Sequence, residues 1–178
     1  VAGHSEGSLI GMIACQRIKA NGFISIAGPG RPVDDLLKSQ LKAVVPDSAY
    51  FAKCSHYLDT LHAGHRIEHP DSILYAIFRP SIQPYLINWM QYDPAKEIGK
   101  LHIPVLVLQG DNDLQIDVSN ANLLAGGNKK AKLHIIEGMN HVLKKVDADR
   151  AKNMASYSDP SLPVADELVK EIAQAIQQ

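Results

Sequence analysis

The sequence has few cysteines, almost no net charge and no long apolar run, and each scarcity excludes a class of protein. Its two cysteines, Cys15 and Cys54, lie far apart and match no metal-binding or redox spacing. A formal net charge of −1 gives no electrostatic reason to expect binding to nucleic acid or to an anionic membrane. No apolar run approaches the ~20 residues of a membrane-spanning helix. We therefore expect neither a nucleic-acid-binding protein nor a membrane protein.

The composition is that of a folded domain. Hydrophobic residues make up 46% of the sequence and charged residues 21%, which is ordinary for a globular protein. A chain of 178 residues is long enough to bury one hydrophobic core. Neither a targeting segment nor cysteine usage indicates a compartment, so the localisation stays unknown.

Apolar runs of strand length alternate along the chain with longer helical patterns. Strands are expected over 22–27, 103–110 and 131–137, and helices over 8–19, 117–125 and 163–176. The run at 103–110 is continuously apolar, as in a parallel strand that is buried on both faces. Strands that alternate with helices predict an α/β fold with a mostly parallel sheet.

The segment 31–101 has a different character. Helical patterns at 33–45 and 47–62 are followed by a region that prolines interrupt repeatedly, and eight of the ten aromatic residues of the chain lie in this segment. We interpret 31–101 as an inserted helical segment between two parts of a sheet-forming core, 1–30 and 102–178. The three parts are expected to form one domain.

The stretch Gly3-His4-Ser5-Glu6-Gly7 fits G-x-S-x-G, in which a serine sits on a sharp strand-to-helix turn. A serine hydroxyl becomes nucleophilic when a base removes its proton, and the base needs an acid that fixes its tautomer. Carboxylates at 111 and 113 follow the strand at 103–110, and His141 follows the strand at 131–137. All of these positions come after strands, where open α/β sheets place their sites.

The segments GHSEGS, PVLVLQGDNDLQI and IIEGMNHVL resemble those of the α/β-hydrolase superfamily, of the bacterial esterase and serine-aminopeptidase-like kind. The resemblance implies a partial α/β-hydrolase fold, with the end of the fifth strand, the sixth to eighth strands and a helical cap at 31–101. It also implies a serine hydrolase that cleaves small carboxylic esters through an acyl-Ser5 intermediate. We expect neither a cofactor nor a metal.

The resemblance assigns roles to individual residues. The catalytic acid occupies the fourth position of G-x-x-D, which is Asp113; its rival Asp111 is expected to hydrogen-bond within the turn. His141 corresponds to the base. The backbone N–H of Glu6 corresponds to a donor to the oxyanion. His4 is expected to shape the wall of the substrate pocket.

The aromatic residues Phe78, Tyr85 and Trp89 have two interpretations. They either pack the core of the helical cap or line an apolar pocket for the substrate, and we take them as candidates for substrate contact. Arg79 also has two interpretations. It either binds a carboxylate of the substrate or forms an ion pair inside the cap.

Three histidines of the same segment, His62, His65 and His69, have the spacing of one helix face and could in principle hold a metal ion. No cysteine or carboxylate completes a familiar metal signature, and Gly64 weakens a helix between them. We therefore expect a polar face and no metal site.

The chain begins inside the nucleophile motif, with only Val1 and Ala2 before Gly3. The resemblance implies further strands and a second oxyanion donor ahead of this point. We expect the sequence to be part of a longer enzyme, and the exposed sheet edge to be covered by the missing N-terminal half or by a second copy of the chain.

Two alternatives to the esterase stay open at this level. A peptidase or amidase that acts on small substrates would use the same three side chains. A non-catalytic fragment or binding module would keep the fold without half of the oxyanion hole.

Overall fold

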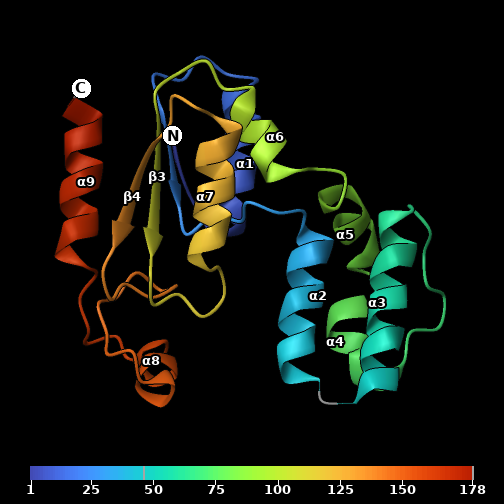
Figure 1. Ribbon diagram of the computed structural model, residues 1–178. Helices are drawn as coiled ribbons and strands as arrows, with labels where there is room; N and C mark the ends of the chain where they lie inside the picture. Colours follow the sequence, from blue (N-terminus) through green and yellow to red (C-terminus); the bar gives the residue numbers. More distant parts are fainter. Residues whose placement is uncertain (46, 178) are drawn as a thin grey trace. The chain divides into compact units, whose positions relative to one another are not determined.

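The computed structural model describes residues 1–45 and 47–177, and these form two compact units (Figure 1). The first, which we call the sheet unit, comprises Val1–Gly30 and residues 94–177. The second, the helical unit, comprises Arg31–Asp93. No helix among the described residues is long and apolar enough to cross a membrane.

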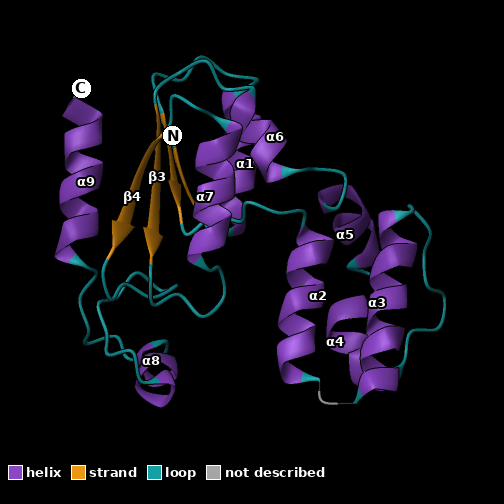
Figure 2. Cartoon of the chain, in the orientation of Figure 1, coloured by secondary structure: helices purple, strands orange, loops and turns teal. Residues whose placement is uncertain are grey.

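A four-stranded parallel sheet forms the centre of the sheet unit (Figure 2). Its strands stand in the order of the sequence: β1 (Ala2–His4), β2 (Phe23–Ile26), β3 (Val105–Gly110) and β4 (Lys132–Ile136). The sequence prediction of an α/β fold with parallel strands is therefore confirmed. Because all strands run the same way, the loops that follow them meet at one edge of the sheet.

Helices cover both faces of this sheet. The sheet unit contains α1 (Glu6–Cys15), α6 (Pro94–Gly99), α7 (Val118–Gly127), α8 (Arg150–Ser156) and α9 (Asp166–Gln177). Helices α1, α6 and α7 lie on one side of the sheet and α9 on the other (Figure 1). Helix α6, although it falls within the predicted segment 31–101, packs against α1 and α7.

The apolar core of the sheet unit explains why α9 lies where it does. The side chains that it shares with the sheet are Ile24, Ile26, Leu106, Leu108, Ile136, Met139, Ala165 and Leu168. Alternate residues of β2 and β3 point to this face, as the two-residue period of a strand requires. Each large apolar side chain that is fully buried contributes about 1.5–3 kcal/mol, so this layer fixes α9 against the strands.

Side-chain caps set where several helices begin. Asp117 accepts the backbone N–H of Ser119 at 2.8 Å and starts α7, and Asp149 accepts that of Lys152 at 2.9 Å and starts α8. Helix α1 is shorter than the predicted 8–19. It starts directly after Ser5 and ends at Cys15, because a tight turn onto the carbonyl of Ala14 closes it.

The helical unit contains α2 (Val33–Val44), α3 (Ser48–His62), the 3₁₀-helix η1 (Ser72–Leu74), α4 (Tyr75–Phe78) and α5 (Gln83–Trp89). The helices expected over 33–45 and 47–62 are confirmed. Asp47 starts α3 by accepting the N–H of Tyr50 at 2.7 Å. The core is almost wholly apolar and is formed by Val33, Leu41, Cys54, Leu58, Leu61, Leu74, Phe78, Leu86 and Met90.

Candidate active site

Ser5 lies in a strained turn between β1 and α1. Its backbone has φ 54° and ψ −126°, which costs a residue other than glycine about 1–3 kcal/mol. The turn is held because the Ser5 N–H donates to the carbonyl of Ile26 at 2.9 Å and the Ser5 carbonyl accepts from Ser8 N–H at 2.9 Å. Gly3 is needed here, since a Cβ on it would lie 2.1 Å from the carbonyl oxygen of Gly7.

The side chains of Ser5, Asp113 and His141 meet beyond the carboxyl ends of β1, β3 and β4. His141 Nδ1 lies 2.8 Å from Asp113 Oδ2, and His141 Nε2 lies 3.1 Å from Ser5 Oγ. A carboxylate only accepts, so Nδ1–H donates to Asp113, and the neutral ring then offers Nε2 as an acceptor to the Ser5 hydroxyl. With His141 only 5% exposed, this arrangement can take the proton of the serine with little competition from water.

Asp113 is held by four donors. One carboxylate oxygen accepts the backbone N–H groups of Gln115 and Ile116 at 2.8 and 2.9 Å. The other accepts His141 and the side-chain amide of Gln109, the latter at 3.2 Å. Because the side chain is buried and every partner donates, its orientation toward the imidazole is fixed.

Asp111, the rival carboxylate, has a different place. It is exposed, and its Oδ1 accepts the backbone N–H of Gly138 at 2.6 Å. Gly138 has φ 72°, a left-handed conformation that favours glycine. Asp111 therefore ties its own turn to the turn after β4, rather than bonding within its own turn as the sequence suggested.

Glu6 opens α1 immediately after Ser5. The N–H of a first helical residue has no acceptor within its helix, so this group is free to face an anion near the Ser5 side chain. Burial raises the pKa of the Glu6 carboxyl. The role of the Glu6 N–H as a donor to the oxyanion stays a prediction.

His4 lies against His141. Its Nε2–H donates to the backbone carbonyl of His141 at 2.8 Å, and the two rings are 5.0 Å apart at a tilt of 43°. Burial lowers the pKa of His4, and the nearby charge of His141 lowers this pKa further, while the bond to the His141 carbonyl opposes the shift. The predicted role of His4 in a pocket wall stays a prediction, and the contact with the His141 loop is an addition to it.

Residues that the sequence reasoning did not single out hold the loops together. Gln109, which is fully buried, donates to Asp113 and to the carbonyl of Ile116 at 2.8 Å. Asn140 and Asn153 are fully buried as well and link the loop after β4 to α8. Gln109 lies four residues before Asp113, and Asn140 directly precedes His141. Closeness in sequence to a predicted site residue could therefore have identified both. Asn153 lies in a polar segment without any such neighbour.

The three aromatic candidates for substrate contact differ in their surroundings within the helical unit. Phe78 is fully buried and packs edge-on against Tyr57, with the ring centres 5.3 Å apart. Tyr85 is 43% exposed, and its ring lies 5.5 Å from that of Trp89. Arg79 is exposed and donates to the carbonyl of Ala76 at 2.9 Å. Contact with a substrate stays a prediction for all of them.

The three histidines of the helical unit do not share a helix face, because α3 ends at His62 and both His65 and His69 follow it. His62 instead pairs with Asp34 at 3.0 Å. Among residues 1–45 and 47–177, no group of three or more His, Cys, Asp or Glu side chains is arranged to hold a metal ion.

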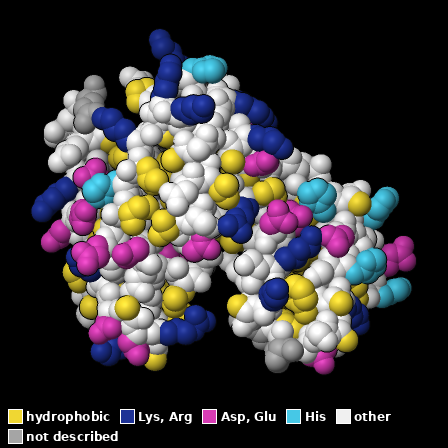
Figure 3. Space-filling view, in the orientation of Figure 1, with side chains coloured by type: hydrophobic (Ala, Val, Ile, Leu, Met, Phe, Trp, Pro, Cys, Tyr) yellow, Lys and Arg dark blue, Asp and Glu magenta, His cyan; other side chains and the backbone are white. Residues whose placement is uncertain are grey.

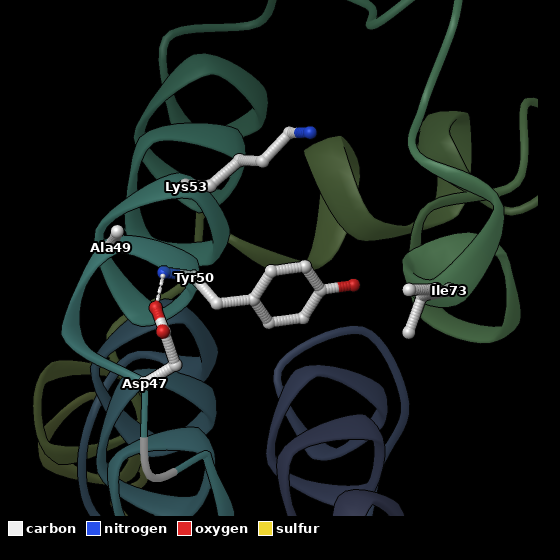
Figure 4. A pocket seen from close by; sticks show the side chains of 5 residues that line it. All are labelled: Asp47, Ala49, Tyr50, Lys53 and Ile73. Carbon is white, nitrogen blue, oxygen red and sulfur yellow. Dashed lines mark hydrogen bonds between the residues drawn. The ribbon is translucent and has the colours of Figure 1, made fainter.

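The helical unit has a pocket that none of the predicted site residues lines (Figure 4). It is lined by Asp47, Ala49, Tyr50, Lys53 and Ile73. On the face that Figure 3 shows, acidic and basic side chains are intermixed, as expected from the net charge. Neither feature competes with the Ser5 site as a place for chemistry.

Comparisons with known proteins show what the chain as a whole is similar to. No protein-family model matches the sequence. The chain is 26% identical over 156 residues to the esterase EstD of Thermotoga maritima; the match covers 80% of this chain and 34% of EstD. The chain thus spans about a third of the length of that relative.

Solved structures with a similar fold cover more of the chain. Est1E from Butyrivibrio proteoclasticus matches 97% of this chain and 60% of its own, at 18% identity and a TM-score of 0.49. A lipase-esterase related protein from Clostridium acetobutylicum matches 88% of this chain and 64% of its own, at 20% identity and a TM-score of 0.47. The sequence is thus similar to that of an esterase, and the resemblance to esterase-like members of the α/β-hydrolase superfamily is confirmed.

Proposed function

We propose that this protein hydrolyses small carboxylic esters through an acyl-Ser5 intermediate. One observation carries the proposal: the two ring nitrogens of His141 lie 3.1 Å from Ser5 Oγ and 2.8 Å from Asp113 Oδ2. Nucleophilic acyl transfer needs a hydroxyl, an imidazole and a buried carboxylate that contact one another in this order. The relationship to an esterase supports the ester as the substrate class.

In the first half of the reaction, Ser5 Oγ attacks the ester carbonyl carbon while His141 Nε2 takes the hydroxyl proton. The carbonyl π electrons move to oxygen and give a tetrahedral oxyanion. When this intermediate collapses, the bond to the alcohol oxygen breaks, and the proton on Nε2 passes to the leaving alkoxide. The products are an acyl ester on Ser5 and a free alcohol.

In the second half, a water molecule replaces the alcohol. His141 removes one of its protons as its oxygen attacks the acyl carbon, and the second oxyanion collapses with cleavage of the Ser5 Oγ–carbon bond. The proton then returns from Nε2 to Ser5. The carboxylic acid leaves, and the three side chains are back in their starting state.

Two further groups assist the proposed reaction. Asp113 stabilises the imidazolium that forms on His141 in both halves, and it keeps the hydrogen on Nδ1. The N–H of Glu6 donates to the oxyanion, and a donor of this kind is worth about 3 kcal/mol in the transition state. Glu6 follows Ser5 directly and is the first residue of α1, so its N–H belongs to the end of the helix whose N–H groups have no acceptor within the helix.

We also propose a place for this chain in the complete fold. β1 to β4 correspond to the end of the fifth strand and the sixth to eighth strands of an α/β-hydrolase sheet, and the helical unit, 31–93, corresponds to its helical cap. β1 is an edge strand of the four, and further chain of the same protein or a second copy would cover it. Of the cap aromatics, the half-exposed pair Tyr85 and Trp89 suits contact with a substrate better than the buried Phe78.

A fluorophosphonate probe tests the proposal, because it phosphonylates only a serine that a base has activated. The protein is expressed from its complete reading frame and exposed to the probe, beside the variants Ser5→Ala, His141→Ala and Ser8→Ala. Ser8 is the matched control: it is a buried hydroxyl three residues away that pairs with Ser25.

Labelling of the wild type and of Ser8→Ala, with none of Ser5→Ala and a strong loss in His141→Ala, is the expected result. Hydrolysis of p-nitrophenyl esters should follow the same order. A folded wild type that is never labelled and hydrolyses no ester would overturn the proposal and favour a binding module.

A further inference from the structure

The helix α8 lies beyond the carboxyl ends of β3 and β4 (Figure 1). One of its side chains, Asn153, is fully buried although the helix is short and mostly polar. A buried amide costs stability unless both of its ends are hydrogen-bonded, so its partners are informative.

Asn153 bonds in two directions. Its Nδ2–H donates to the backbone carbonyl of Asn112 at 2.7 Å, and its Oδ1 accepts from Nδ2 of Asn140 at 3.1 Å. Asn112 is the residue before Asp113, and Asn140 is the residue before His141. One side chain therefore joins the two loops that carry the acid and the base, at positions adjacent to both.

Backbone groups determine the orientation of both amides. The backbone N–H of Lys144 can only donate, and it donates to Oδ1 of Asn140 at 3.0 Å. The NH₂ group of Asn140 therefore faces Asn153, whose own NH₂ group must face the carbonyl of Asn112. We call this chain of hydrogen bonds, from Lys144 N–H through Asn140 and Asn153 to the carbonyl of Asn112, the relay. Each of its bonds points the same way, and reversing either amide would place two donors or two acceptors against each other.

Other contacts brace the same relay. Asn140 also donates to Ser156 Oγ at 2.7 Å, and that hydroxyl donates to the carbonyl of Asn153 at 2.6 Å. Lys144 Nζ donates to the carbonyls of Ser156 and Asp159 at the end of α8. The helix is thus fastened to the loop after β4 at several points, and to the residue before Asp113 through Asn153.

Building on the proposed function, we infer that Asn153 is a positioning residue: its amide sets the separation of the Asp113 and His141 loops, and so the contact between the imidazole and both of its partners. The backbone bond from Asn112 N–H to the Met139 carbonyl at 3.2 Å joins the same loops where the strands end. The bond from Gly138 N–H to the Asp111 carboxylate joins them as well. Asn153 adds a buried attachment at Asn112 and Asn140, directly beside the acid and the base, and each further attachment restrains hinge motion between the loops.

The substitution Asn153→Asp tests this inference because it keeps the shape of the side chain and replaces its donor by an acceptor. An oxygen would then face the carbonyl oxygen of Asn112, and the two loops would separate. Displacements of about 1 Å at a reacting group can cost about 100-fold in rate, so we expect kcat to fall by about 10- to 100-fold with KM changed by less than about twofold.

Asn128→Asp is the matched control in the same unit. Asn128 is also buried, and its Nδ2 donates to the carbonyls of Ile98 and Leu101 at 3.0 and 3.1 Å. The substitution removes the same kind of donor bond away from the Ser5 site. Both variants should melt at a lower temperature than the wild type, and only Asn153→Asp should lose kcat. Asn153→Ser, with a shorter donor, replaces the aspartate variant should that one not fold.

A second readout separates this inference from the proposed function. The His141 Nδ1–H that bonds to Asp113 is expected to give a far-downfield proton NMR signal, which would depend on the contact and not on catalysis. Loss of this signal in Asn153→Asp and its retention in Asn128→Asp would support the positioning role even if the wild type hydrolysed no ester. A retained signal, or a kcat equal to that of Asn128→Asp in an active enzyme, would overturn it.

Discussion

The sheet unit and the helical unit bury different kinds of side chain. In the sheet unit, buried polar side chains gather at and beyond the carboxyl ends of β3 and β4: Gln109 in β3, Asp113, Asn140 and His141 in the loops that follow, and Asn153 in α8. In the helical unit, nine apolar or sulfur-containing residues make up the core, and Gln83 and Asp34 are its buried polar side chains among the described residues.

This difference has consequences for substitutions. A buried polar side chain in the strand-end loops must present a donor or an acceptor in one direction, so an isosteric change can displace a neighbouring reactive group. A buried apolar side chain contributes through volume and area, so its loss lowers stability without a specific direction. We therefore expect the sheet unit to respond to substitution in rate and the helical unit in stability.

The largest effect is expected for the two carboxylates after β3. Asp113→Asn should lower kcat by about 10⁴-fold, because an amide that donates toward Nδ1 favours the wrong tautomer of His141. Asp111→Asn should lower kcat by less than about tenfold, since this side chain bonds only a backbone N–H. Steady-state hydrolysis of p-nitrophenyl acetate measures both, with circular dichroism as the check on folding. Equal losses would mean that the two carboxylates do not differ in role.

The next effect belongs to the helical unit. Phe78→Ala should cost about 3–5 kcal/mol of unfolding free energy because it empties a fully buried site. Tyr85→Ala, at a side chain that is 43% exposed, should cost less than about 1 kcal/mol. Urea unfolding followed by circular dichroism compares them. Similar losses for the two, or a large loss of kcat in folded Phe78→Ala, would blur the distinction between the units.

A glycine where the two loops touch should give a smaller change that appears mainly in rate. A Cβ at Gly110 would lie 1.9 Å from the carbonyl oxygen of Met139, so Gly110→Ala must push the loop after β4 away. We expect a loss of about 100-fold in kcat. Gly126→Ala, in an open position of α7, is the control and should raise stability by about 0.5–1 kcal/mol. An unchanged kcat in Gly110→Ala would show that the loops tolerate separation.

Periodicity and turn residues were enough to predict the strands β2, β3 and β4 of the sheet unit, although not the helices α6 and α8. The apolar runs at 22–27, 103–110 and 131–137 contain β2, β3 and β4, because parallel strands buried on both faces need continuous apolar sequence. The order of these strands also predicts that Ser5 and His141 meet, since the loops after parallel strands share one edge.

Other features depend on contacts that no local pattern encodes. Residue type alone left Asp111 and Asp113 as alternatives, because each follows β3 and the choice is made by which side chain turns inward. Asn153 gave no signal, since a polar residue in a polar segment is buried only when the chain folds over it. The spacing of His62, His65 and His69 suggested that they share one helix face. Helix α3 instead ends at His62, before the other two, and Gly64, with φ 84°, allows the chain to turn there.

The smallest expected effect concerns the pH dependence of stability. Burial lowers the pKa of His4 from its ordinary value of 6.5, which means that the unfolded chain takes up this proton more readily than the folded one. The contribution is therefore fully present above pH 6.5 and is lost as the pH falls below it toward the folded pKa. The effect is small because the His4 side chain keeps substantial contact with solvent.

His4→Gln isolates this contribution, because glutamine can still donate to the His141 carbonyl and does not titrate. The urea midpoint of the wild type should fall between about pH 7.5 and about pH 5.5 by more than that of His4→Gln. His102→Gln, at an exposed residue just before β3, should fall as far as the wild type. If His4→Gln loses as much stability as the wild type over this range, the acid sensitivity arises elsewhere, and the strand-end loops of the sheet unit are less tightly coupled to His4 than the 2.8 Å contact suggests.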